Sequence, residues 1–261
     1  ERRMILKSRA FFDASPASEK LLVEAHRTND QVLFEAGIAT GGPWRHDSET
    51  LFYRLTLHAF RQDGFRDNVF LNRSNTNARR EFTGRFQLLF EPAPDSRHEF
   101  TFLGVAHQNG YDAFAPTGDG FSMFTDDPGR DALRLGGFSL RSTYQQPRGF
   151  DLLSITSGTL ADQIYSYDAD WANDAFWAGP PYFFDPAVEG FRNSFTERLD
   201  RTRRQLRQEF RFMSKPGEGL FDGRSAWSLG TVLGWLEEED DYVGFSTLQS
   251  QYQAVTSAVY G

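Results

Sequence analysis

The sequence predicts an all-β protein: an antiparallel, up-and-down transmembrane β-barrel, of which this chain supplies about eleven strands. Apolar and polar residues alternate with a period of two through most of the 261 residues, and helical periodicity is nearly absent. Long connections alternate with short ones. The mean hydropathy is −0.54, and no run approaches the ~20 apolar residues of a membrane helix. Alternating strands remain compatible with a membrane at this hydropathy.

Eleven segments alternate clearly enough to be predicted as strands. In chain order they are 4–12, 20–28, 31–40, 51–60, 81–91, 99–109, 134–145, 150–159, 203–214, 227–235 and 245–260. Most are near the ~9–11 residues that a tilted strand needs to cross a membrane. The predicted lipid-facing residues are Phe82, Phe86, Phe90, Leu206, Phe210 and Phe212, and the predicted lumen-facing residues are Arg85, Arg203, Arg207 and Arg211.

The connections between these segments are of two kinds. The short ones are rich in turn-forming residues: 13–19, 41–49, 92–97, 146–149 and 216–225. The long ones are 63–79, 110–133 and 160–200, with 28–30 as a short exception. Two strands separate consecutive long connections. A meander therefore places the long loops at one rim, predicted extracellular, and the short turns at the other, predicted periplasmic.

The composition excludes several functional classes. With no cysteine, the chain forms no disulfide scaffold, zinc-thiolate site or thiol nucleophile. The net charge of −8, without a separate basic patch, argues against a nucleic-acid partner. The five histidines lack metal-ligand spacing, and no catalytic or phosphate-binding motif is present. We therefore predict no enzyme activity, cofactor or metal site.

Alternation alone does not distinguish a membrane barrel from a soluble β-sandwich, which hides its apolar face inside. Arg203, Arg207, Glu209 and Arg211 recur at two- or four-residue spacing on one face. Such ionic ladders are typical of barrel interiors, although a solvated strand face would show the same pattern. Trp227 and Trp235 fall on one face at a spacing compatible with two aromatic girdles, or with two core tryptophans.

Four segments resemble TonB-dependent outer-membrane receptors. RTRRQLRQEFRFMSKPG followed by AWSLGTVLGWLEEEDD is similar to a strand–turn–strand unit that leads to an acidic loop. GGPWRHDSETLFYRLTLHAFRQDGFRDN and GRFQLLFEPAPDSRHEFTF resemble earlier hairpins of the family. The resemblance covers roughly 41–242 and implies energised uptake of a bulky, scarce solute across the outer membrane. The solute would be a metal chelate such as a siderophore, a vitamin or an oligosaccharide.

The chain departs from that family pattern in extent. No segment resembles the plug domain, the TonB box or the terminal strand. Receptors with a plugged lumen have about 22 strands, so residues 1–261 are expected to be part of a single barrel domain completed by further strands or another chain. Contact with TonB would use segments that this chain lacks. A passive porin and a soluble, all-β glycan-binding module are the alternatives.

The connection 160–200 is the candidate ligand-binding loop, because it is dense in aromatic residues that strand packing does not explain. The predicted contacts are Trp171, Phe176, Trp177 and Tyr182; packing against neighbouring loops is the alternative. Asp168, Asp170, Asn173 and Asp174 weakly resemble an oxygen-ligand calcium site, but their spacing lacks the glycine and closing glutamate of an EF-hand.

Overall fold

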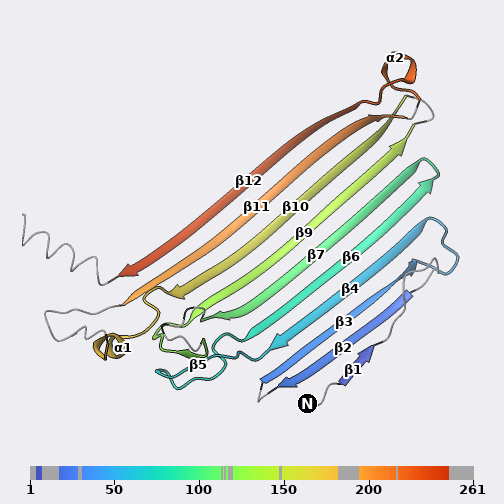
Figure 1. Cartoon of the computed structure of the whole chain (residues 1–261). Coiled ribbons are helices and arrows are strands. Elements are labelled where there is room, and N and C mark those ends of the chain that lie inside the picture. Colours follow the sequence, from blue (N-terminus) through green and yellow to red (C-terminus); the bar gives the residue numbers. More distant parts are fainter. Residues whose placement is uncertain are drawn as a thin grey trace, which may run out of the picture.

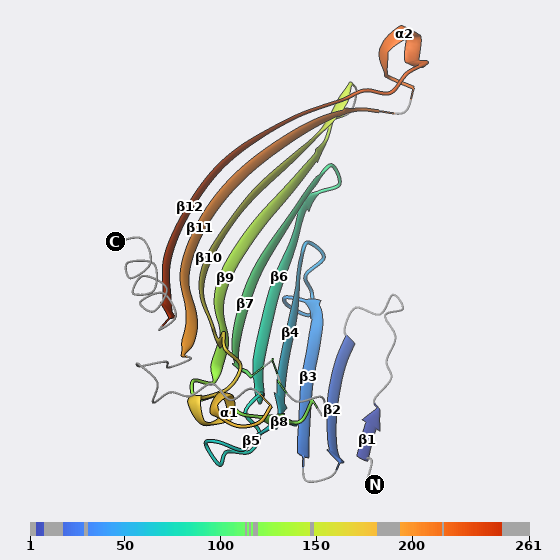
Figure 2. The same cartoon turned by 60° about the vertical axis from the view of Figure 1, so that its left-hand side comes forward.

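The computed structural model describes residues 4–7, 18–28, 31–112, 114, 116, 120–146, 149–181, 194–215 and 217–246. They form one open, ten-stranded antiparallel sheet whose strands follow chain order (Figure 1). The strands are β1 (Met4–Lys7), β2 (Ser18–Thr28), β3 (Gln31–Pro43), β4 (Leu51–Gln62), β6 (Arg79–Ala93), β7 (Ser96–Tyr111), β9 (Gly129–Gln145), β10 (Phe150–Asp168), β11 (Phe195–Ser214) and β12 (Ser228–Ser246). The sheet is curved along its strands, with β1 and β12 at its edges (Figure 2).

Four short elements lie in the connections. β5 (Asp67–Asn68) and β8 (Ser122–Met123) form a two-stranded parallel pair that joins two loops. α1 (Asp174–Ala178) follows β10, and α2 (Leu220–Gly223) precedes β12. Among the described residues, no helix combines the length and apolarity needed to span a membrane.

All strands but β1 (Met4–Lys7, predicted as 4–12) are longer than the sequence predicted. Ten predicted segments overlap strands of the sheet. The eleventh, 245–260, shares only its first two residues with the end of β12 and otherwise lies outside the described residues. The prediction of 160–200 as one loop is wrong: β10 extends to Asp168 and β11 begins at Phe195, leaving 169–194 as the connection. The β10–β11 register runs unbroken through this region. Pairing can persist there because backbone hydrogen bonds between strands do not require apolar side chains.

Alternate connections lie at the same end of the strands, because each strand is antiparallel to its neighbour. The connections 63–78, 112–128 and 169–194 lie at one end, which we call the loop end and which carries β5, β8 and α1 (Figure 1). The connections 44–50, 94–95, 146–149 and 215–227 lie at the opposite, turn end, which carries α2. Apart from the short link between β2 and β3, whose strand ends Thr28 and Gln31 also lie at the loop end, the long and short connections are therefore segregated.

The register divides the side chains between an apolar face and a polar face. A row across the apolar face contains Leu55, Phe86, Phe102, Phe138, Gly158, Leu206 and Trp235. Arg85, Arg203, Arg207 and Arg211 lie on the polar face, as the alternation predicts. Phe102, Leu206 and Trp235 remain 46%, 49% and 53% exposed. No second layer of the described residues covers this apolar face.

The apolar residues form a band that crosses the strands obliquely. On β6 the band extends toward the loop end as far as Phe82, which aligns across the sheet with Thr202 of β11. On β11 the band already ends at Leu206, four residues nearer the turn end. Beyond it, the same face of β11 carries Arg204, Thr202 and Asp200. The strands are thus tilted relative to the band and project beyond it at the loop end.

Candidate functional site

An aromatic pocket lies on the polar face at the loop end of β10, β11 and β12. Its volume is about 520 Å³, within the range of ligand-binding clefts. Its lining residues are Phe114, Tyr165, Tyr167, Ala169, Trp171, Phe195, Glu197, Arg198, Leu199 and Tyr242. Tyr165 and Tyr167 are brought to the same face by the two-residue repeat of β10 and are paired opposite β11.

The rings of the pocket form a continuous cluster. Trp171 stacks on Phe114 with ring centroids 5.5 Å apart and planes inclined by 27°. Phe114 also contacts Tyr167 at 6.1 Å, and Tyr167 lies 5.7 Å from Tyr165. The Tyr167 hydroxyl donates a hydrogen bond to Glu197 Oε2 at 2.5 Å. The pocket thus offers π-faces with polar edges, which suit a flat or amphipathic ligand.

Trp171 is the exposed residue in a buried segment. Its side chain is 44% exposed, whereas Asp168, Asp170, Ala172 and Asn173 are all at least nine-tenths buried. Its backbone has φ +67°, a left-handed conformation that bulky residues rarely adopt. Strained residues of this kind persist where their surroundings hold them, often at binding sites.

Two aspartates hold this conformation. The Asp170 N–H donates to Asp168 Oδ1 at 3.2 Å, and the Asp170 carboxylate accepts from the N–H groups of Ala172 and Phe195. Burial, together with the adjacent Asp170, raises the pKa of Asp168 to about 9. Burial also raises the pKa of Asp170. The segment is therefore fixed by buried hydrogen bonds on both sides of Trp171.

Phe176 and Trp177 lie in a different environment from Trp171. Both lie on α1, whose N-cap Asn173 accepts a hydrogen bond from the Phe176 N–H at 3.0 Å. The Phe176 ring packs on Phe124 of the 112–128 connection at 4.8 Å, and Trp177 lies edge-on to Phe176 at 5.3 Å. Neither residue lines the aromatic pocket. Tyr182 lies outside the described residues.

Three of the four residues of the weak calcium pattern have structural roles in this segment. Asp168 and Asp170 accept backbone N–H groups, and Asn173 caps α1. Within the described ranges, no group of three or more histidine, aspartate or glutamate side chains is arranged to hold a metal ion.

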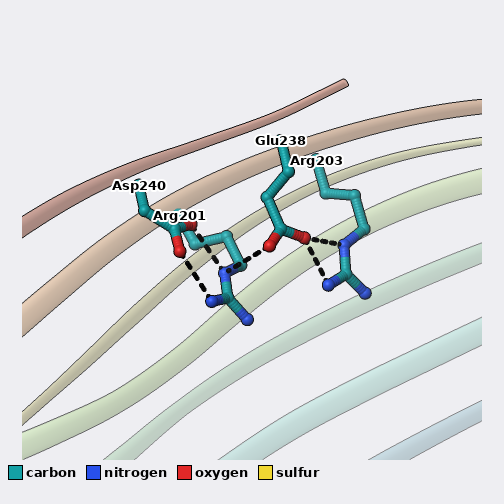
Figure 3. Close-up of polar contacts among 4 residues, drawn as sticks. All are labelled: Arg201, Arg203, Glu238 and Asp240. Atoms are coloured by element: carbon teal, nitrogen blue, oxygen red, sulfur yellow. Dashed lines mark hydrogen bonds and ion pairs between the residues drawn. The ribbon is translucent and has the colours of Figure 1, made fainter. Parts of the chain in front are cut away.

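An ion-pair ladder extends along the polar face between β11 and β12 (Figure 3). Arg201 makes two 2.7 Å hydrogen bonds to the Asp240 carboxylate and lies 3.6 Å from Glu238, which also pairs with Arg203. Nearer the turn end, Glu209 pairs with Arg207 and Arg211. Except for the buried Glu209, these groups are partly exposed. Exposed pairs contribute little stability, so the main consequence of the ladder is a hydrated, charged surface.

The sequence analysis missed some residues of the ion-pair ladder and of the aromatic pocket. It placed the acidic residues 237–241 at the entry to a loop, whereas they lie within β12. It also omitted Phe114, Glu197 and Tyr242 from the candidate site. The available signal for the pocket was the two-residue repeat at Tyr165 and Tyr167, because these residues continue the face of β10 that carries Ala161 and Gln163.

No protein-family model matches the chain, and no curated protein matches its sequence. Among solved structures, the chain is similar to the siderophore receptor PiuA from Acinetobacter baumannii, with 10% sequence identity and a TM-score of 0.39. The similarity covers 87% of this chain and 43% of that receptor, so the chain spans less than half of the receptor's length. Similarity at this level assigns neither a family nor a function.

Proposed function

We propose that this chain is part of a TonB-dependent receptor barrel that takes up a bulky, scarce solute across a Gram-negative outer membrane. The observation that carries the proposal is the oblique apolar band on a single-layer sheet. A face with rings as exposed as Phe102 and Trp235 needs an apolar environment, and lipid provides it. The resemblance of four sequence segments to these receptors supports the same function.

The remaining features fit this placement. The polar face, with its arginine–carboxylate ladder, would line the lumen. The two open edges, β1 and β12, would pair with further strands or another chain, because backbone groups in lipid must be hydrogen-bonded. The loop end, where strands project beyond the band, would face the exterior and carry the aromatic pocket.

Membrane insertion is tested by fractionation. The protein is expected in the outer-membrane fraction, in solution only with detergent. A soluble glycan-binding module would remain in solution without it. Energised uptake is then separated from passive flow by collapsing the inner-membrane proton gradient: uptake through a receptor stops while binding persists, whereas flow through a porin continues.

The binding role of the pocket is tested with Trp171→Ala. The probes are ferric catecholate and hydroxamate chelates, cobalamin and maltooligosaccharides. We expect one of them to bind and the variant to weaken its binding by about 10- to 100-fold, the value of one buried ring. Trp44→Ala is the control, since Trp44 is similarly exposed but lies at the turn end. Equal affinities of the two variants would remove Trp171 from the site.

A further inference from the structure

Four arginines lie on the apolar face just beyond the band at the loop end. Arg61 of β4 and Arg80 of β6 are direct cross-strand partners, and Arg130 and Arg134 lie on the same face of β9. All four are exposed. Like charges placed directly opposite in a sheet repel each other, so a bound counter-charge would stabilise this arrangement.

Carboxylates of the protein do not supply that counter-charge. Among the described residues, none of the four guanidinium groups makes an ion pair or a side-chain hydrogen bond. Asp162, the register neighbour of Arg134, accepts a hydrogen bond from the Thr202 hydroxyl instead. On the same face of β11, by contrast, Arg198 pairs with Asp200, and Arg204 pairs with Glu237 of β12.

Beside these arginines, the band contains a groove. Gly84, Gly104 and Gly136 align in one row across β6, β7 and β9. A Cβ atom added at Gly104 or Gly136 would meet nothing within 4 Å, so the row is open at these two positions, whereas one at Gly84 would lie 3.3 Å from Leu57 Cδ2. Glycine weakens a strand and often marks a site where another molecule approaches closely.

The groove continues across the sheet from Gly136. A cavity of about 460 Å³ lies there, lined mainly by Phe102, Gly136, Phe138, Leu160, Leu206 and Trp235. Its surface is almost wholly apolar, and Arg134 precedes Gly136 by two residues on the same face. An apolar groove with unpaired cations at its outer margin is complementary to an anionic amphiphile.

We propose that this surface binds a bisphosphorylated glycolipid of the leaflet at the loop end, an inference that rests on the proposed membrane location. Arginine binds phosphate oxygens bidentately, and basic clusters at membrane level bind anionic headgroups. The Arg61–Arg80 pair and the β9 arginines are separated by about two strand spacings, roughly 10 Å. Two phosphates on one headgroup match this separation, and an acyl chain fills the groove.

The test uses the detergent-solubilised protein and three probes: bisphosphorylated lipid A, its dephosphorylated form and inorganic phosphate. We expect bisphosphorylated lipid A to bind at least about 10-fold more tightly than the dephosphorylated lipid. Arg80→Gln and Arg134→Gln should each remove most of that preference. Arg85→Gln, on the polar face of β6, is the matched control and should retain it.

Gly104→Leu tests the groove separately, because it fills the open row without changing charge; it should weaken lipid binding while the protein stays inserted. Displacement of the lipid by millimolar inorganic phosphate would identify a simple anion site and overturn the lipid assignment. Equal binding by wild type, Arg80→Gln and Arg134→Gln would also overturn it. Absence of the protein from the membrane fraction would refute the proposed function itself, so the two failures are distinguishable.

Discussion

Phe86→Arg tests directly which face of the sheet meets lipid. Phe86 lies midway along the apolar stretch of β6, which runs from Phe82 to Phe90, and its cross-strand neighbours are Leu55 and Phe102. A charge at the midplane of a barrel's lipid face costs about 2–4 kcal/mol. The substitution should therefore lower the equilibrium constant for folding into vesicles by roughly 30- to 700-fold.

Two further substitutions make the result specific to membrane depth and face. Phe82→Arg, at the edge of the band, should cost only about 0–1 kcal/mol, because the penalty falls toward the interface. Thr101 lies on the polar face of the neighbouring strand, between Gln87 and Ser139. Thr101→Arg should therefore change the free energy of folding very little. Urea titration of folding into phosphatidylcholine vesicles measures all three. If Phe86→Arg and Thr101→Arg have equal effects, the apolar face does not contact lipid.

Two other predictions concern the loop end. Proteases added to intact cells should cut within 169–194 and spare 215–227, and mass spectrometry of the fragments gives the sites; cleavage confined to 215–227 would reverse the orientation. The folded state holds a proton on Asp168 up to about pH 9, whereas the unfolded state releases it near pH 4, so local stability should fall as the pH rises between these values. Asp168→Asn keeps the Oδ1 acceptor and should slow amide exchange around Trp171 at pH 8, after correction for intrinsic exchange rates. At pH 4 it should change the exchange rate little. Equal effects of the substitution at the two pH values would contradict the buried proton.

The existence of most strands and the division of their faces could be predicted from the sequence. Alternation places Phe82 and Phe86 on one face and Arg85 on the other whatever the neighbouring strands are, because successive side chains of a strand point to opposite faces. The segregation of long and short connections was likewise predictable, since it follows from antiparallel order. Local backbone geometry is sufficient for both.

The candidate site was only partly readable. The aromatic density of the 160–200 segment indicated the right region, and Trp171 does line the pocket. Phe176 and Trp177, equally aromatic, pack against the 112–128 connection through Phe124 instead. Composition does not distinguish these environments, because the partners come from loops distant in sequence.

The sequence by itself therefore determined the strand class, the two faces and the order of the connections, all of which depend on the period of two. Only the tertiary structure decided where strands end and which charges are paired. Register aligns Arg201 with Asp240, 39 residues away, and leaves Arg61 opposite Arg80. Such pairings depend on how separate strands align with one another, and a pattern within a single strand carries no information about that alignment.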